Sequence, residues 1–180
     1  MSGALLVLLV VAAVNPPRTR IALPDQLGGP AAGVGLGLSV AVVAAIAASS
    51  GTVLDILEIS PETFLIATGL VAVIAGTVMS FSPEPRVEPP LAGWRVGVWP
   101  VAFPLLLSPQ VLLLAVALPG QVGVWATVVA HAVAFGLAIG LALFPGRDLG
   151  RRLLASLGVA LGAVLVVGGI WAMIEGIRDV

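Results

Sequence analysis

The chain has little charge and no cysteine. Only 9% of its 180 residues are charged, whereas 59% are hydrophobic, and the mean hydropathy is +1.18. A soluble domain of this size needs far more charge to cover its surface, so the composition indicates that a lipid bilayer surrounds the protein. The absence of cysteine excludes disulfides, thiolate metal sites and cysteine nucleophiles.

Groups that carry enzymatic chemistry are also scarce. The chain has one histidine, and no apolar segment contains a carboxylate pair, a cluster of metal ligands or a nucleophile beside a base. We therefore expect a protein that is not an enzyme and that has no cofactor, no bound metal and no nucleic-acid partner.

Six apolar segments approach the roughly 20 residues that a transmembrane helix needs. They lie at 4–23, 31–49, 62–81, 98–118, 122–143 and 153–174. The first resembles a signal peptide in its short apolar run, Ala4–Val14, but it lacks a basic stretch before that run and has a counterpart later in the chain. The prediction is an all-α integral membrane protein with six transmembrane helices and no soluble domain.

All eight basic residues are arginine, and six spans distribute them unequally. One side of the membrane would carry Arg18, Arg20, Arg86, Arg95, Arg147, Arg151 and Arg152. The other side would carry Arg178 together with Asp55, Glu58, Glu62, Glu175 and Asp179. The positive-inside rule then places the arginine-rich side in the cytoplasm and both termini outside it, in the plasma (inner) membrane.

The two halves of the chain, 1–81 and 97–180, repeat each other on either side of a proline-rich connector at 82–96. A constant offset of 93 residues relates Gly69, Ala75 and Gly76 to Gly162, Gly168 and Gly169, and Asn15-Pro16 to Ser108-Pro109. Three spans per half is an odd number, so the second half must enter the membrane from the opposite face. The expected architecture is a 3+3 inverted repeat, which is typical of secondary transporters with a substrate site near the midplane.

Proline interrupts the first and fourth predicted spans at equivalent places, Asn15-Pro16 and Ser108-Pro109. Proline removes a backbone donor inside a helix, and Asn or Ser before it favours a new helix start. Each span is therefore predicted to be two half-helices, whose free N–H groups would favour an anionic or strongly polar ligand. We predict a substrate pocket lined by Asn15, Pro16, Ser108 and Pro109. The alternative is a pair of kinks that only shape the bundle.

Polar side chains near these breaks and in the fifth span are further candidates. Arg18 follows the first break and would touch substrate or act in gating, whereas Arg20 would reach the membrane interface and help to set the topology. Gln110 offers a polar group at the second break. His131, midway along the fifth span, is a candidate proton relay; the alternative is a packed neutral imidazole bonded to a partner such as Thr127.

Small residues recur at a spacing of four in three predicted spans. They are Thr68, Ala72, Gly76 and Ser80 in the third, Gly136 and Gly140 in the fifth, and Gly158 and Gly162 in the sixth. Such stripes let helix backbones approach closely in a membrane. Packing within the chain is the expected role, and a homo-oligomer is the alternative.

Several short motifs resemble those of the MarC family. They are the Asn-Pro break, Ser60–Phe64 leading into Ile66–Gly69, and Pro100–Leu105 before Ser108-Pro109. This family belongs with the LysE-type exporters and includes transporters of small neutral amino acids, so the resemblance implies six spans, a 3+3 inverted repeat and movement of a small solute. The chain differs in having Arg18 and Gln110 where the family has glycine, and Leu65 where arginine is usual. These differences indicate a narrower cavity of different charge.

The leading functional interpretation is a secondary transporter for a small polar or anionic metabolite such as an amino acid. The alternative is a translocase for an anionic lipid or polyprenyl-phosphate head group. A passive pore and a non-transporting partner subunit are two further interpretations that the sequence leaves open.

Overall fold

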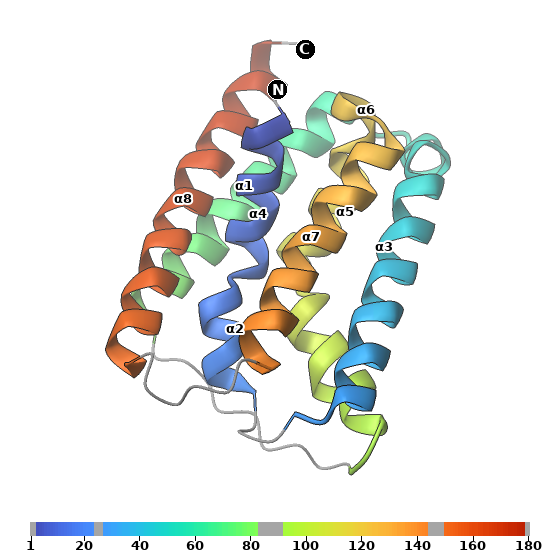
Figure 1. Cartoon of the computed structure of the whole chain (residues 1–180). Coiled ribbons are helices and arrows are strands. Elements are labelled where there is room, and N and C mark those ends of the chain that lie inside the picture. The colour runs from blue at the N-terminus through green and yellow to red at the C-terminus, as the bar shows by residue number, and fades with distance from the viewer. Residues whose placement is uncertain (1–2, 24–26, 83–91, 144–149, 179–180) are drawn as a thin grey trace.

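The computed structural model describes residues 3–23, 27–82, 92–143 and 150–178, and every element within these ranges is helical (Figure 1). In chain order the elements are α1 (Gly3–Val14), α2 (Pro16–Ala22), α3 (Gly29–Ile56), α4 (Pro61–Phe81), η1 (Gly97–Leu106), α5 (Pro109–Ala117), α6 (Pro119–Val122), α7 (Val124–Leu143) and α8 (Arg151–Arg178). The predicted all-α class is confirmed for the described part of the chain. Most of the predicted connector, residues 83–91, lies outside it.

Five stretches of the described chain are long and apolar enough to cross a membrane, and α1 with α2 forms the first of them. A sixth is obtained when η1 and the α5–α6 segment, which meet at a bend of 67°, count as one span. These stretches match the six predicted segments in order. They support the prediction of a membrane-embedded protein.

The second predicted span, 31–49, is too short, because α3 extends to Ile56 and has 28 residues. The prediction ended this span at the run Ser49–Thr52, whose residue types favour helix ends and turns. In the structure the hydroxyl of Ser49 donates to the carbonyl of Ala45 at 2.8 Å, and that of Ser50 donates to the carbonyl of Ala47 at 2.9 Å. These bonds satisfy both hydroxyls inside the helix, so the helix continues through them.

The chain runs back and forth along the axis of the bundle (Figure 1). From the end that holds both termini, α1 and α2 lead away, α3 returns and α4 leads away again. In the second half η1 and α5 lead toward that end, α7 leads away and α8 returns to it. The spans before the connector therefore run away, back and away, and the spans after it run back, away and back.

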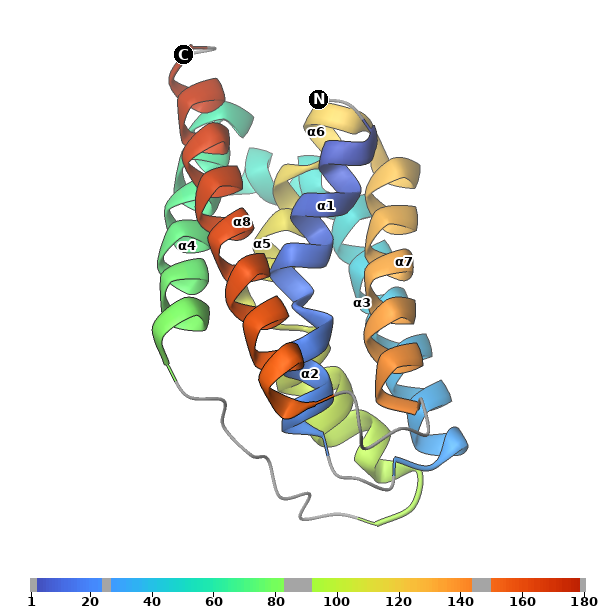
Figure 2. The same cartoon turned by 60° about the vertical axis from the view of Figure 1, so that its left-hand side comes forward.

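The helix pair α1–α2 lies in the middle of the bundle, between α7 and α8 (Figure 2). In the stretch Leu5–Ala22, 61% of the residues are buried, whereas 22% are buried in an apolar stretch of the same length in α8. Val10, Ala12 and Ala13 have no accessible surface at all. The interruption at Asn15 therefore lies in the interior of the protein, where its backbone groups must find partners within the protein.

Glycines bring α4 and α8 into close antiparallel contact. A Cβ atom placed on Gly69 would lie 2.5 Å from the carbonyl oxygen of Gly169, and one on Gly76 would lie 2.5 Å from that of Gly162. No other residue type fits such a contact, which is the small-residue packing expected in a membrane. The stripes of α4 and α8 thus pack within the chain, whereas Gly136 and Gly140 of α7 have nothing within 4 Å of an added Cβ.

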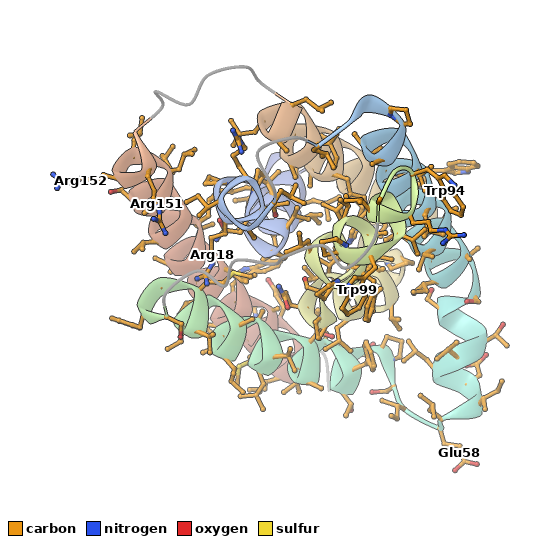
Figure 3. The ribbon with its side chains drawn as sticks, turned by 90° about the horizontal axis from the view of Figure 1, so that it is seen from below. Arg18, Glu58, Trp94, Trp99, Arg151 and Arg152 are labelled. Carbon is orange, nitrogen blue, oxygen red and sulfur yellow. The ribbon has the colours of Figure 1, made fainter. Side chains whose placement is uncertain are left out.

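The charged residues separate to the two ends of the bundle. Arg18, Arg20, Arg95, Arg151 and Arg152 lie at the end away from the termini, from which Figure 3 is viewed. Asp55, Glu58, Glu62, Glu175 and Arg178 lie at the other end. Arg86, Arg147 and Asp179, which were part of the predicted charge pattern, lie outside the described residues.

Candidate functional site

The first interruption is a single residue, Asn15, between α1 and α2. Pro16 disfavours the right-handed helical conformation at the residue before it, and Asn15 adopts the left-handed region with φ 51° and ψ 69°. Its side-chain oxygen accepts a hydrogen bond from the amide of Arg18 at 3.3 Å, so the predicted cap is confirmed. Its side-chain nitrogen donates to the carbonyl of Gly158 on α8 at 2.8 Å. Both polar groups of Asn15 therefore have partners within the protein.

Two other side chains bond to two of the carbonyls that this interruption frees. Pro17 has no amide hydrogen to give the carbonyl of Ala13, and the side-chain amide of Gln110 on α5 donates to that carbonyl at 3.1 Å. The hydroxyl of Thr19 donates to the carbonyl of Val14 at 3.2 Å. Gln110 thus links the second break to the first. Thr19 was not among the predicted site residues, although a threonine just after a Pro-Pro pair is a usable signal for such a bond.

The second interruption lies at Leu107 and Ser108, before α5. Ser108 is extended, with φ −73° and ψ 157°, and α5 begins at Pro109 as predicted. The prediction of a side-chain cap here is wrong, because the Ser108 hydroxyl makes no cap hydrogen bond. Its oxygen is buried and has no hydrogen-bond partner among the described residues. The site therefore contains one polar group whose hydrogen-bonding capacity these residues leave unused.

The segment η1 that leads to this break is more irregular than predicted. Trp99 and Phe103 have extended backbone angles, and each precedes a proline, Pro100 or Pro104. A proline forces the residue before it away from the helical region and also lacks an amide hydrogen, which explains the irregularity. The amide of Leu107 donates to the carbonyl of Ala102, five residues back, at 2.8 Å, which is the wide turn of a π-helix.

A cavity of about 310 Å³ lies where the two interruptions meet. It is lined by Val14, Asn15, Arg18, Thr19 and Ala22 from the α1–α2 pair, by Ala75, Val78 and Met79 from α4, and by Pro104, Leu105, Ser108 and Gln110 from η1 to α5. The structure thus brings four predicted site residues, Asn15, Arg18, Ser108 and Gln110, to one cavity. The predicted Pro16 and Pro109 are not among the lining residues.

Arg18 is the one charged residue in the lining, which contains no carboxylate. Its guanidinium donates a hydrogen bond to the carbonyl of Met79, in the last turn of α4. A carbonyl at a helix C-terminus carries partial negative charge and holds the guanidinium in place without neutralising it. Among the described residues, Arg18 therefore gives the lining a single positive charge. Arg20, by contrast, does not line the cavity.

The cavity opens on the flank of the bundle between α4 and η1. Val78 and Pro104 on the two sides of the opening are exposed. Val78 lies in the last turn of α4, so the opening is near the arginine-bearing end of the protein. Figure 3, viewed from that end, shows Arg18 close to α4.

His131 lies apart from this cavity, on the buried face of α7. Its Nδ1 lies 2.8 Å from the carbonyl oxygen of Thr127, and its ring meets Phe135 edge-on at a centroid distance of 6.0 Å. The alternative of a packed neutral imidazole named Thr127 as the partner of His131, and the contact is made by the backbone carbonyl of Thr127. Nε2 is buried as well.

Known proteins give no relative against which to interpret this cavity. No protein family, no curated protein and no solved structure matches the chain. The described residues contain no group of three His, Cys, Asp or Glu side chains able to hold a metal ion. The fold and the cavity are therefore the evidence for function.

Proposed function

We propose that the protein is a secondary transporter that carries a small polar or anionic metabolite, such as an amino acid, through the cavity at the two interruptions. The observation that supports this most directly is the cavity itself. Between its helices, an apolar bundle holds a space whose described lining contains an arginine with no carboxylate beside it, a serine hydroxyl without a hydrogen-bond partner and two amide side chains. Charged and polar groups are costly at such a place in a membrane protein and usually mark a substrate pathway.

The size of the cavity favours a small solute. Pockets for small molecules measure roughly 300–1,000 Å³, and about 310 Å³ is at the lower end of that range. The positive charge of Arg18 would attract a carboxylate or another anionic group, and the Ser108 hydroxyl can donate to it or accept from its amine. An amino-acid-sized substrate meets both conditions.

The proposal includes a 3+3 inverted repeat, for which the α4–α8 contact is the best support. Under the 93-residue offset, Gly69 of the first half is equivalent to Gly162 of the second, and Gly76 is equivalent to Gly169. The contact between Gly69 and Gly169 is therefore equivalent to the contact between Gly162 and Gly76, and the structure contains both contacts. A two-fold axis between the halves produces such reciprocal pairs. The opposite directions of corresponding segments agree with an axis in the membrane plane (Figure 1).

We further propose that the arginine-bearing end faces the cytoplasm, in accordance with the positive-inside rule. The opening of the cavity lies near this end, so the conformation described here would be open toward the cytoplasm. The short motifs that resemble those of the MarC family favour transport of a small solute.

A second candidate function is translocation of an anionic lipid or polyprenyl-phosphate head group. The lateral position of the opening, between α4 and η1, specifically favours it, because a head group could enter from the bilayer while its chains stay in lipid. Arg18 would then bind the phosphate.

Proteoliposome uptake distinguishes the two candidates. Purified protein is tested with a panel of radiolabelled amino acids and anionic metabolites, with and without a proton gradient, and in parallel for movement of fluorescent anionic phospholipid between leaflets. Saturable solute uptake that is lost in Ser108→Leu and kept in Ser49→Leu, a matched change at an exposed position of α3, supports the transporter. Lipid movement without solute uptake supports the second candidate. Absence of both activities refutes the proposal.

A further inference from the structure

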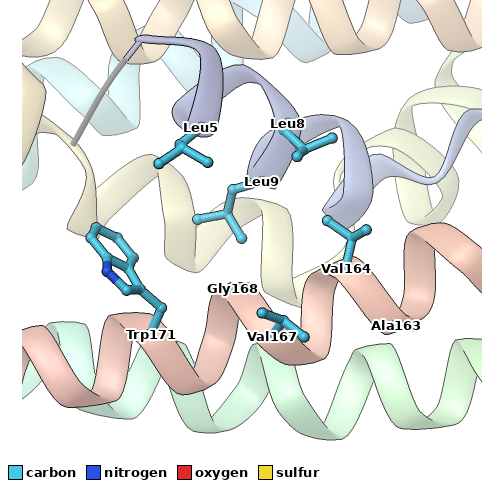
Figure 4. A pocket seen from close by; sticks show the side chains of 8 residues that line it. All are labelled: Leu5, Leu8, Leu9, Ala163, Val164, Val167, Gly168 and Trp171. Carbon is cyan, nitrogen blue, oxygen red and sulfur yellow. The ribbon is translucent and has the colours of Figure 1, made fainter.

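A second hollow, an apolar groove of about 490 Å³, lies between α1 and α8 (Figure 4). Its lining residues are Leu5, Leu8 and Leu9 of α1 with Ala163, Val164, Val167, Gly168 and Trp171 of α8. None of them carries a charge. Leu5, Leu8 and Val167 are exposed, so the groove lies on the outside of the bundle where two apolar helices face the membrane.

Gly168 forms the floor of this groove. A Cβ atom placed on Gly168 would lie 2.5 Å from Cδ1 of Leu9, so the Leu9 side chain rests directly on the backbone of α8. Leu9 closes the bottom of the space, while the exposed Leu8 and Val167 border it toward the membrane. An empty groove of this kind would forfeit the dispersion contacts of all its lining atoms.

The groove extends over the depth of one leaflet. Ala163 lies near the middle of the 28-residue helix α8, and Trp171 lies eight residues further on, which corresponds to about 12 Å. Half of the hydrocarbon core of a bilayer is about 15 Å. A membrane-spanning partner helix would require a seam along the full bilayer depth, whereas this groove ends near the middle of the helix. Its length fits one acyl chain.

The end of the groove near the termini has the residues of a membrane interface. Figure 4 shows Trp171 at this end, beside the start of α1. Tryptophan prefers the head-group level because its ring is apolar and its N–H is polar. Arg178 follows Trp171 by seven residues, or two turns, and so lies on the same face of α8 above the groove. It is exposed and is the one arginine at this end among the residues that the structure describes.

We propose that this groove binds one acyl chain of an anionic phospholipid from the leaflet on the side of the termini, with Arg178 at the lipid phosphate. The proposal concerns a site separate from the cavity at the interruptions and does not depend on transport. The lipid would fill the space above Leu9 and bind α1 to α8 along this leaflet.

Photolabelling tests the site. The protein is reconstituted with phosphatidylglycerol that carries a diazirine in the middle of one acyl chain, irradiated and digested. Labels are expected on Leu5–Leu9 and on Ala163–Trp171 above the level of other exposed segments. Ala163→Trp, which fills the groove, should reduce this labelling about tenfold, a difference of roughly 1.4 kcal/mol.

Ala41→Trp is the matched control, because Ala41 is exposed and lies twelve residues after the start of 28-residue α3, as Ala163 does in α8. It should leave the labelling unchanged. Equal labelling of Ala163→Trp and the parent protein, or a crosslink of the groove to a second copy of the chain, would overturn the acyl-chain site. Arg178→Gln should lower labelling by phosphatidylglycerol but not by phosphatidylcholine, and equal effects on the two would overturn the role of Arg178.

Discussion

Arg18 and Arg20 are neighbouring arginines of one short helix in different surroundings. Arg18 lines the cavity and is held by the Met79 carbonyl, whereas Arg20 does not line it. Arg18→Gln should reduce uptake efficiency about tenfold or more, because a hydrogen bond to a charged group contributes about 1.5–3 kcal/mol and 1.4 kcal/mol is a factor of ten. Arg20→Gln should transport nearly as well as the parent. Equal uptake by both variants, at matched expression, would remove Arg18 from the site.

Gln110 has a structural role that can be tested separately from transport. Gln110→Leu leaves the buried carbonyl of Ala13 without its donor, at a cost of about 1–3 kcal/mol. The Tm in detergent should fall by about 2–4 °C for each kcal/mol. Gln121→Leu, the same change at an exposed position of α6, should have little effect.

A second substitution checks the cause of this loss. Pro17→Ala restores an amide hydrogen four residues after Ala13, so it should recover part of the Tm in the Gln110→Leu background. If Pro17→Ala lowers the Tm of Gln110→Leu further, the missing donor is not the reason for the instability.

At the scale of elements, the sequence predicted what depends on local chemistry. Proline positions indicated the helix starts at Pro16, Pro61 and Pro109, and the hydroxyl of Ser60 caps α4 by accepting from the amide of Thr63 at 3.2 Å. Apolar runs indicated the spans. The bond from Gln110 to Ala13 was beyond prediction, because it joins residues 97 positions apart and depends on how two breaks pack. The irregularity of η1 was accessible from Pro100 and Pro104 but was not predicted.

The contact of α4 with α8 should be sensitive to a single methyl group. Gly69→Ala places that group against the Gly169 carbonyl and forces the two backbones apart, at a cost of about 1–3 kcal/mol. Its Tm in detergent should fall accordingly. Gly140→Ala on α7 is the control, because nothing lies within 4 Å of its added Cβ, and its Tm should stay the same. A lower oligomeric state of Gly140→Ala in size-exclusion chromatography would instead assign the α7 stripe to a homo-oligomer.

At the scale of the whole molecule, the two hollows occupy corresponding places. Under the proposed repeat, the 93-residue offset relates Gly168 and Trp171 of the groove to Ala75 and Val78 of the cavity. One hollow lies between α1 and α8 and the other between η1 and α4, toward opposite ends. The halves have nevertheless acquired different chemistry, since Arg18 and Gln110 line the cavity and only apolar residues line the groove.

The orientation of the whole molecule in the membrane is the remaining prediction. Both termini lie at the end opposite to the described arginines of α2 and of the start of α8 (Figure 1). Arginines near short loops stay in the cytoplasm, so both termini should lie outside it. A reporter that is active only in the cytosol should be silent when fused after Val180 and active when inserted in the connector 82–96. The connector fusion controls for expression, because six spans place it on the opposite side from the C-terminus. Strong cytosolic activity of the fusion after Val180 would contradict the orientation, and equal activity of both fusions would contradict the odd number of spans per half on which the inverted repeat depends.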